Sequence, residues 1–101
     1  MPRLVIFREQ RLHRFVELGD RLLKVGRGQQ NDVVLDDPDK VVSRFHAELR
    51  PENDHYVLVD LNSQNGTWMD EERVERVTMH PGIAVAIGPY QLVVERGADA
   101  R

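Results

Sequence analysis

The sequence VSRFHAEL, residues 42–49, places a hydroxyl, a guanidinium and an imidazole at the start of an alternating apolar run. Phe45, Ala47 and Leu49 occupy every second position and polar or charged residues fill the others, which is the period of a half-buried β-strand. A helix competes with this interpretation. Apolar residues of the stretch also fall near a 3.6-residue spacing, and an Asp-Pro pair at 37–38 supplies an N-cap and a first helical position. The local pattern leaves strand and helix open.

Short apolar runs continue on both sides of this stretch. The runs are residues 4–7, 12–18, 22–25, 33–35, 55–61, 67–69, 73–77, 83–87 and 91–95. Turn residues separate them: Gly19-Asp20 predicts a hairpin-type turn, residues 51–54 predict another turn, and the acidic residues 36–39 predict a solvated turn. About ten short runs with turns between them are typical of an antiparallel β-sandwich or barrel, which favours a strand for residues 42–49.

A length of 101 residues predicts one domain, because two halves would each bury too little apolar surface. We assign residues 1–96 to this domain and residues 97–101 to a flexible tail. A composition of 41% hydrophobic and 31% charged residues is that of an ordinary globular protein. No segment has the roughly 18 apolar residues of a membrane span. The N-terminal apolar run is followed at once by charged residues, unlike a signal peptide, so we expect a cytoplasmic protein.

The composition also argues against disulfide, metal and nucleic-acid chemistry. The chain has no cysteine, which excludes disulfide bonds and thiolate metal sites. The acidic residues 36–39 lack the ligand spacing of a calcium loop, and the other histidines are dispersed along the chain, so no metal is expected. A formal net charge of -3 argues against nonspecific binding to duplex nucleic acid, which needs a broad cationic surface.

A sandwich gathers its loops at two ends, so polar residues that are distant in sequence can form one recognition surface. Arg27 offers a planar fork of donors, Ser43 a hydroxyl and Arg44 a second guanidinium. Together they predict a site for a compact oxyanion such as phosphate. Asn65 carries both a donor and an acceptor and is suited to hold a peptide backbone.

Five segments around these residues match a known family in order and spacing. The segments are residues 26–27, 31–35, 43–47, 59–67 and 87–88. They resemble the forkhead-associated (FHA) domain, and the resemblance covers roughly residues 22–94. It implies an all-β, eleven-stranded antiparallel β-sandwich that binds phosphothreonine peptides through loops at one end, without catalysis and without a cofactor.

The resemblance also implies roles for individual residues. Arg27, Ser43 and Arg44 match the positions that contact phosphate, and Asn65 matches the position that holds the peptide main chain. Gln64 lies where the family often has a small hydroxyl residue near the phosphothreonine, and we place it among the peptide-binding residues. The positions that shape and support the binding loops are Gly26, His46, Gly66 and Thr67.

The implied partner is a phosphothreonine-containing protein or peptide in signalling, which requires an upstream Ser/Thr kinase. The domain is expected to be a monomer that binds neither nucleic acid nor a membrane. Gln64 and the acidic turn at residues 70–72 motivate an alternative, a phosphate-independent FHA-like assembly or scaffold domain. A small hydrolase using Ser43 and His46 is disfavoured, because side chains three residues apart on a strand point to opposite faces.

Overall fold

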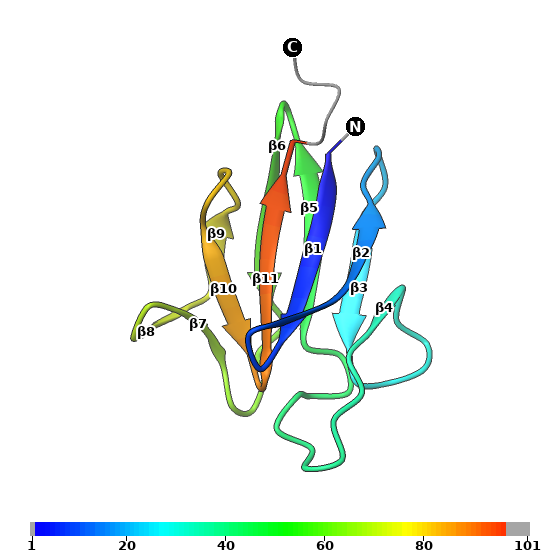
Figure 1. Ribbon diagram of the computed structural model, residues 1–101, viewed down its shortest axis with the longest axis vertical. Coiled ribbons are helices and arrows are strands. Elements are labelled where there is room, and N and C mark those ends of the chain that lie inside the picture. The colour runs from blue at the N-terminus through cyan, green and yellow to red at the C-terminus, as the bar shows by residue number, and fades with distance from the viewer. Residues whose placement is uncertain (1, 97–101) are drawn as a thin grey trace.

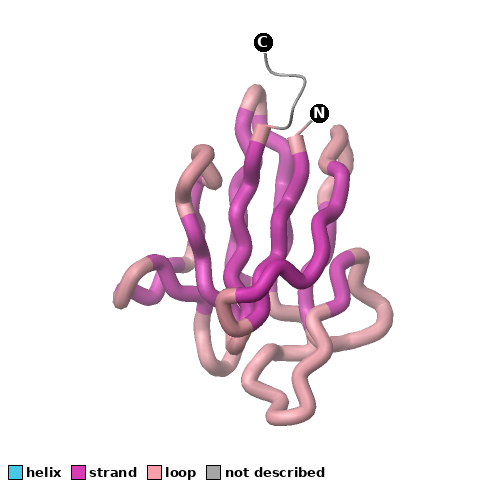
Figure 2. Tube along the Cα trace, viewed as in Figure 1, coloured by secondary structure: helices cyan, strands magenta, loops and turns pink. Residues whose placement is uncertain are grey.

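The computed structural model describes residues 2–96, which form eleven β-strands and no helix (Figures 1 and 2). The strands are β1 (Arg3–Arg8), β2 (Arg11–Glu17), β3 (Leu23–Gly26), β4 (Val33–Val34), β5 (Ala47–Glu52), β6 (His55–Asp60), β7 (Thr67–Met69), β8 (Glu72–Val74), β9 (Arg76–Thr78), β10 (Ala84–Ile87) and β11 (Tyr90–Glu95). They confirm the predicted β-sandwich. The predicted tail, residues 97–101, lies outside the described residues.

The strands form two sheets with the core between them. One sheet has six strands in the order β2-β1-β11-β10-β7-β8, and the other has five in the order β4-β3-β5-β6-β9. All assigned pairs are antiparallel except β3 with β4, which are parallel. Alternation along β11 shows how the core forms: Tyr90, Leu92 and Val94 are buried, whereas Gln91 between them is exposed. The period-two pattern therefore places one face of β11 in the core.

No helix in residues 2–96 has the length and apolar character needed to cross a membrane.

The central stretch differs from its prediction, because β5 begins only at Ala47. Residues 42–46 form a loop, and the alternation is reversed in it: Phe45 is 43% exposed and His46 is fully buried. This segment is a loop because side chains, and not a neighbouring strand, accept the hydrogen bonds of its main-chain amides. The ring Nδ1 of His46 accepts the amide of Ser43, and the carboxylate of Asp37 accepts the amides of two following residues. Side chains that satisfy main-chain amides in this way compete with regular strand pairing.

The hairpin predicted at Gly19-Asp20 is wrong, because β2 and β3 belong to different sheets. Leu18, just after β2, is buried and its amide donates to the carbonyl of Pro2, so the chain turns into the core there before it crosses to the second sheet. The predicted run 73–77 is likewise two strands in different sheets, β8 and β9. They separate at Glu75, whose carbonyl accepts the amide of Asp60.

The predicted turn at residues 51–54 is shorter than expected, because β5 continues through Glu52. Asn53 is in the left-handed region, with φ of 57°, which asparagine tolerates better than most residues. Only Asn53 and Asp54 therefore form the turn between β5 and β6.

The connections that carry the candidate site residues gather at one end of the sandwich (Figure 1). These connections are β3–β4, β4–β5 and β6–β7, and the β10–β11 turn lies at the same end (Figure 1). The opposite end holds the start of β1 and the end of β11. We call the end with these connections the recognition rim.

Candidate functional site

Direct hydrogen bonds join the three loops that carry the predicted site residues. The main-chain amide of Arg27 donates to the carbonyl of Ser43 at 3.0 Å, and its side-chain Nε donates to the carbonyl of Val42 at 2.9 Å. The amide of Gln64 donates to Ser43 Oγ at 3.1 Å, and Asn65 Nδ2 donates to the carbonyl of Val41 at 3.0 Å. The structure therefore brings Arg27, Ser43 and Asn65 together on one rim.

The arrangement leaves polar groups available at the surface of the rim. The bond through Nε fixes the guanidinium of Arg27, whose Nη groups then form a donor fork. Ser43 Oγ accepts a hydrogen bond from Gln64, so its own hydroxyl hydrogen remains a donor. Arg44 and Asn65 are exposed beside them. A half-buried guanidinium, a hydroxyl donor and an exposed second guanidinium are suited to an oxyanion.

The peptide unit of Arg44 packs closely against the turn that follows β3. Its carbonyl accepts the amide of Gly28 at 3.0 Å and Nδ2 of Asn31 at 2.7 Å. A Cβ at Gly26 would overlap the same carbonyl oxygen, so only glycine fits there. This explains the sequence motif Gly-Arg. The glycine lets the loop of Arg44 pack against the end of β3, and the arginine after it bonds the same loop at the rim.

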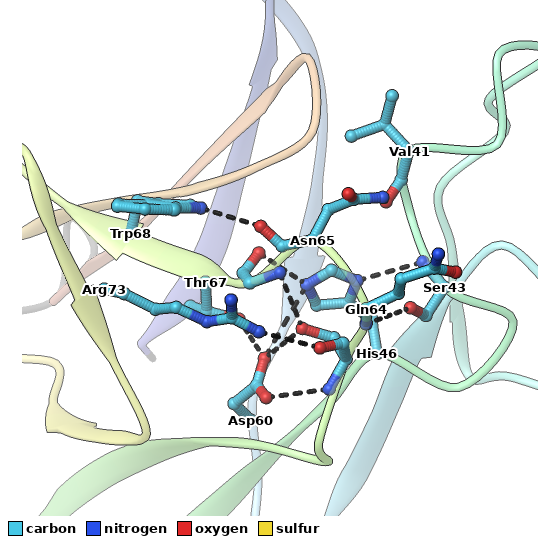
Figure 3. A network of polar contacts seen from close by, with 11 residues as sticks. Val41, Ser43, His46, Asp60, Gln64, Asn65, Thr67, Trp68 and Arg73 are labelled. Carbon is cyan, nitrogen blue, oxygen red and sulfur yellow. Dashed lines mark hydrogen bonds and ion pairs between the residues drawn. The ribbon is translucent and has the colours of Figure 1, made fainter.

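His46 connects two loops from inside the protein. Its Nδ1 accepts the amide of Ser43 at 3.0 Å, so Nε2 carries the proton and donates to the carbonyl of Gly66 at 3.0 Å (Figure 3). Burial lowers the pKa of His46, and the nearby Arg73 lowers it further, while Gly66 and Asp60 act in the opposite direction. The ring is therefore neutral near pH 7 and holds the loops of Ser43 and Gly66 at a fixed distance.

The Ser43–His46 contact is not that of a nucleophile and its base. The imidazole accepts the main-chain amide of Ser43, whereas the hydroxyl of Ser43 accepts the amide of Gln64. Both residues lie in a loop rather than on one strand, so the prediction that their side chains point to opposite faces of a strand was wrong. Among residues 2–96, no hydrogen bond joins the hydroxyl of Ser43 to a ring nitrogen of His46, so the imidazole is not placed to act as its base.

Asp60 organises the loop between β6 and β7 from below (Figure 3). Its carboxylate accepts the amide of Ser63 at 2.9 Å, the hydroxyl of Ser63 at 2.6 Å and the hydroxyl of Thr67 at 2.7 Å. Burial alone would raise the pKa of Asp60, but the hydrogen bonds from Ser63 and Thr67 lower it below its ordinary value. Ser63 Oγ in turn accepts the amide of Gly66 at 3.0 Å, so one carboxylate supports both ends of the loop.

The β7–β8 hairpin supports the same loop from the other side. The indole Nε1 of Trp68 donates to the carbonyl of Asn65 at 2.9 Å, and Arg73 Nη2 donates to the carbonyl of Ser63 at 2.9 Å (Figure 3). Gly66 has φ of 93°, and a Cβ there would lie 2.7 Å from Arg73 Nε. The backbone angle favours glycine at this position, and any side chain there would also have to displace Arg73.

Sequence reasoning missed these supporting side chains. Asp60 has a local signal, because a carboxylate three residues before Ser63 is the spacing of a side chain that bonds a following turn. Trp68, which is 36% exposed, has no such signal, because an aromatic residue in a short apolar run does not indicate a hydrogen bond from its indole to a loop carbonyl. Arg73 has no local signal, because its contact with Ser63 exists only after β7 and β8 have folded back on the loop.

The acidic residues 36–39 are not simply a solvated turn. Asp37 is buried, and its carboxylate accepts the amides of Val41 and Val42 at 2.8 Å and 2.9 Å. These bonds shape the segment that carries the carbonyl partners of Arg27 and Asn65. Among residues 2–96, no cluster of three carboxylate or imidazole side chains is arranged to hold a metal ion.

A family model described as the FHA domain matches residues 23–88. The chain belongs to the FHA domain family. It is similar to the glycogen accumulation regulator GarA of Mycobacterium tuberculosis, with 39% identity over 80 residues. The match covers 79% of this chain and 48% of GarA, so this FHA domain spans about half the length of that relative.

Two solved structures illustrate the likeness of the fold. The FhaA FHA domain, solved in complex with the intracellular domain of Rv3910, has a TM-score of 0.80 and 28% identity, covering 94% of this chain and all of that one. Mycobacterium tuberculosis EmbR, solved in complex with a low-affinity phosphopeptide, has a TM-score of 0.81 and 29% identity. That match covers 99% of this FHA domain and 25% of EmbR.

Acid is expected to destabilise this FHA domain through His46. The pKa of His46 is lowered in the folded state, so below about pH 6.5 the unfolded chain binds a proton that the folded protein does not. The free energy of unfolding should be fully retained above that pH and should fall as the pH drops toward the lowered pKa. The lowered pKa of Asp60 adds a second loss below about pH 4.

Urea unfolding at a series of pH values measures this dependence. A His46→Gln variant should lose most of the slope between about pH 7 and pH 5.5, whereas the exposed His80→Gln variant should keep it. A wild-type stability that stays constant over this range would contradict the assignment of a neutral, buried His46.

Proposed function

We propose that this FHA domain is a noncatalytic module that binds a phosphothreonine-containing segment of a signalling partner at the recognition rim. The observation that carries the proposal is the direct linkage of Arg27, Ser43 and Asn65 through three loops that are far apart in sequence. The phosphopeptide in the EmbR structure supports it, because that protein shares the fold and 29% of its matched sequence.

The available donors match a phosphate dianion. Arg27 supplies a guanidinium fork, Ser43 a hydroxyl donor and Arg44 a second cation. Each charge-assisted hydrogen bond contributes about 1.5–3 kcal/mol, so three contribute about 4.5–9 kcal/mol, and contacts to the peptide main chain have to offset the cost of ordering the ligand for a micromolar affinity of about 8 kcal/mol. With its Nδ2 bonded to Val41, Asn65 has Oδ1 free to accept a main-chain amide of the bound peptide.

The two threonines of the chain favour a phosphothreonine from outside residues 1–101. The chain contains only two threonines, Thr67 on β7 and Thr78 on β9. Thr67 is buried and its hydroxyl donates to Asp60. Thr78 is paired in the second sheet with Val57. We infer that the ligand belongs to another protein, or to sequence that a longer form of this protein would carry.

The remaining features of the proposed role follow from such a ligand. A phosphothreonine requires an upstream Ser/Thr kinase. A segment bound by one rim needs only one copy of the domain, so we propose that the domain is a monomer. We also propose that it acts in the cytoplasm. GarA supports a regulatory setting, because its name describes a regulator of glycogen accumulation.

Titration with peptides tests the proposed function. A phosphothreonine peptide selected from an oriented library should bind the domain with micromolar affinity, and its unphosphorylated twin should not bind measurably. A phosphoserine version should bind more weakly. The affinity should fall below about pH 6, where the phosphate loses its second charge, and with rising salt. Isothermal titration calorimetry measures each of these differences.

Equal binding of the phosphorylated and unphosphorylated peptides would contradict phosphate recognition and support the phosphate-independent assembly domain instead. That second function is motivated by Gln64, which stands exposed beside Ser43 at the rim where the family often has a smaller hydroxyl residue (Figure 3). A pull-down repeated after phosphatase treatment separates the two functions, since only the assembly domain keeps its partner.

A further inference from the structure

The edge strand β2 exposes two large apolar side chains that the recognition rim does not use. β2 is the outermost strand of the six-stranded sheet, with only β1 beside it. Leu12 is 62% exposed and Phe15 is 50% exposed, the largest exposed fractions among the big apolar side chains of residues 2–96. Exposed apolar side chains that share one face of a sheet can mark a binding surface.

A β-bulge puts Leu12 and Phe15 on the same face. Phe15 pairs with Val5 and Leu12 pairs with Phe7, and the register shifts between Ile6 and Phe7. In a regular strand, positions 12 and 15 would point to opposite faces. The bulge adds one residue between them and turns Leu12 to the outer face, where Phe15, Val5 and Phe7 already lie.

Phe15 is also held in place. The guanidinium of Arg3 lies over its ring at 4.4 Å from the centroid, and Arg3 Nε donates to Glu95 at 2.8 Å. A ring fixed in this way loses little freedom on binding, which favours it as an anchor for a partner.

The two strands of the β1–β2 hairpin carry a net positive charge, whereas the net charge of the chain is negative. β1 and β2 together carry four arginines and one glutamate, whereas the whole chain has a net charge of -3. Arg11 and Arg14 are exposed on β2, and neither forms an ion pair with another residue of the described part of the chain. The charge therefore favours an acidic partner.

The free edge indicates the class of that partner. An edge strand presents main-chain donors and acceptors that another extended peptide can pair with, and that a lipid or a nucleic acid cannot use in the same way. A second copy of β2 is disfavoured, because the arginines of the two strands would repel one another. We propose that β2 binds an acidic, extended segment of a partner protein, which adds as a strand beside β2 and covers Leu12 and Phe15.

The probe for this proposal is a capped peptide of about eight residues in which glutamate alternates with valine, a length typical of one strand. In amide NMR spectra of the full chain, titration with it should shift the β2 amides and slow their exchange with solvent. Leu12→Ser and Arg14→Glu should each weaken binding about tenfold. Lys24→Glu, a matched charge reversal on an exposed position of β3, should leave it unchanged.

Three controls decide the result. A twin peptide with lysine in place of glutamate should not bind, and neither should phosphatidylserine vesicles or a single-stranded oligonucleotide. Binding of the lysine twin, binding of vesicles or oligonucleotide in place of the acidic peptide, or unchanged β2 amides at millimolar acidic peptide would each overturn the proposal. The phosphothreonine peptide should bind the Leu12 and Arg14 variants as it binds the wild type, so this test is independent of the recognition rim.

Discussion

The Arg27→Ala variant is expected to bind a phosphothreonine peptide about a hundredfold more weakly than the wild type. The substitution removes a guanidinium that is fixed through Nε on the carbonyl of Val42, in one of the loops of the rim. Losing two charge-assisted hydrogen bonds of about 1.5 kcal/mol each gives this factor. Calorimetric titration of the wild type and the variant with the same peptide measures it.

Two further variants separate charge from geometry. Arg27→Lys keeps the charge but not the fork, so its affinity should fall between those of the wild type and the alanine variant. Arg44→Ala removes an exposed guanidinium and leaves the main-chain carbonyl of residue 44 bonded to Gly28 and Asn31. Its loss of affinity should be smaller than that of Arg27→Ala. Urea unfolding should show that the Arg27 variants remain folded. Wild-type affinity in Arg27→Ala would exclude Arg27 as the phosphate contact.

The His46→Ala variant is expected to lower the free energy of unfolding by about 3 kcal/mol. The imidazole is fully buried, and its removal leaves a cavity together with two main-chain groups that lose their partners, the amide of Ser43 and the carbonyl of Gly66. Urea unfolding at pH 7 measures the change.

The exposed His80 is the matched control for this substitution. Its ring packs edge-on against His55 at the surface, so His80→Ala should change the free energy of unfolding by no more than about 0.5 kcal/mol. A His46→Ala protein as stable as the His80→Ala protein would show that the imidazole does not hold the two loops together.

The number and spacing of the short apolar runs, with turn residues between them, were sufficient to predict the class of fold. The prediction of a strand failed at residues 42–46, where a side chain and not a neighbouring strand accepts a main-chain amide. His46 is buried although its position in the alternating pattern is polar, and its ring nitrogen takes the Ser43 amide that a strand partner would otherwise take. Residue pattern cannot reveal this, because imidazole is both polar and easily buried once its nitrogens are bonded.

The assignment of strands to sheets was also beyond the sequence. Gly19-Asp20 has the composition of a hairpin turn, yet β2 before it and β3 after it belong to different sheets. Local turn chemistry specifies that the chain bends and not which strand it meets next.

In the candidate site, the sequence predicted the residues of the family motif but not the side chains that support their loops. The family motif placed Arg27, Ser43 and Asn65, because their order and spacing are fixed by the loops that carry them. The supports from Trp68 and Arg73 depend on the β7–β8 hairpin folding against the loop between β6 and β7, a tertiary contact with no fixed spacing in sequence.

In the six-stranded sheet, Arg3 at the start of β1 lies directly opposite Glu95 at the end of β11. The polypeptide therefore enters and leaves the sandwich at neighbouring points, on the pole farthest from the loops of Arg27, Ser43 and Asn65 (Figure 1). Adjacent entry and exit points are what allow a domain to be joined to, or inserted into, other polypeptides without distortion. Any tether attached there would leave the opposite pole unobstructed for its partner.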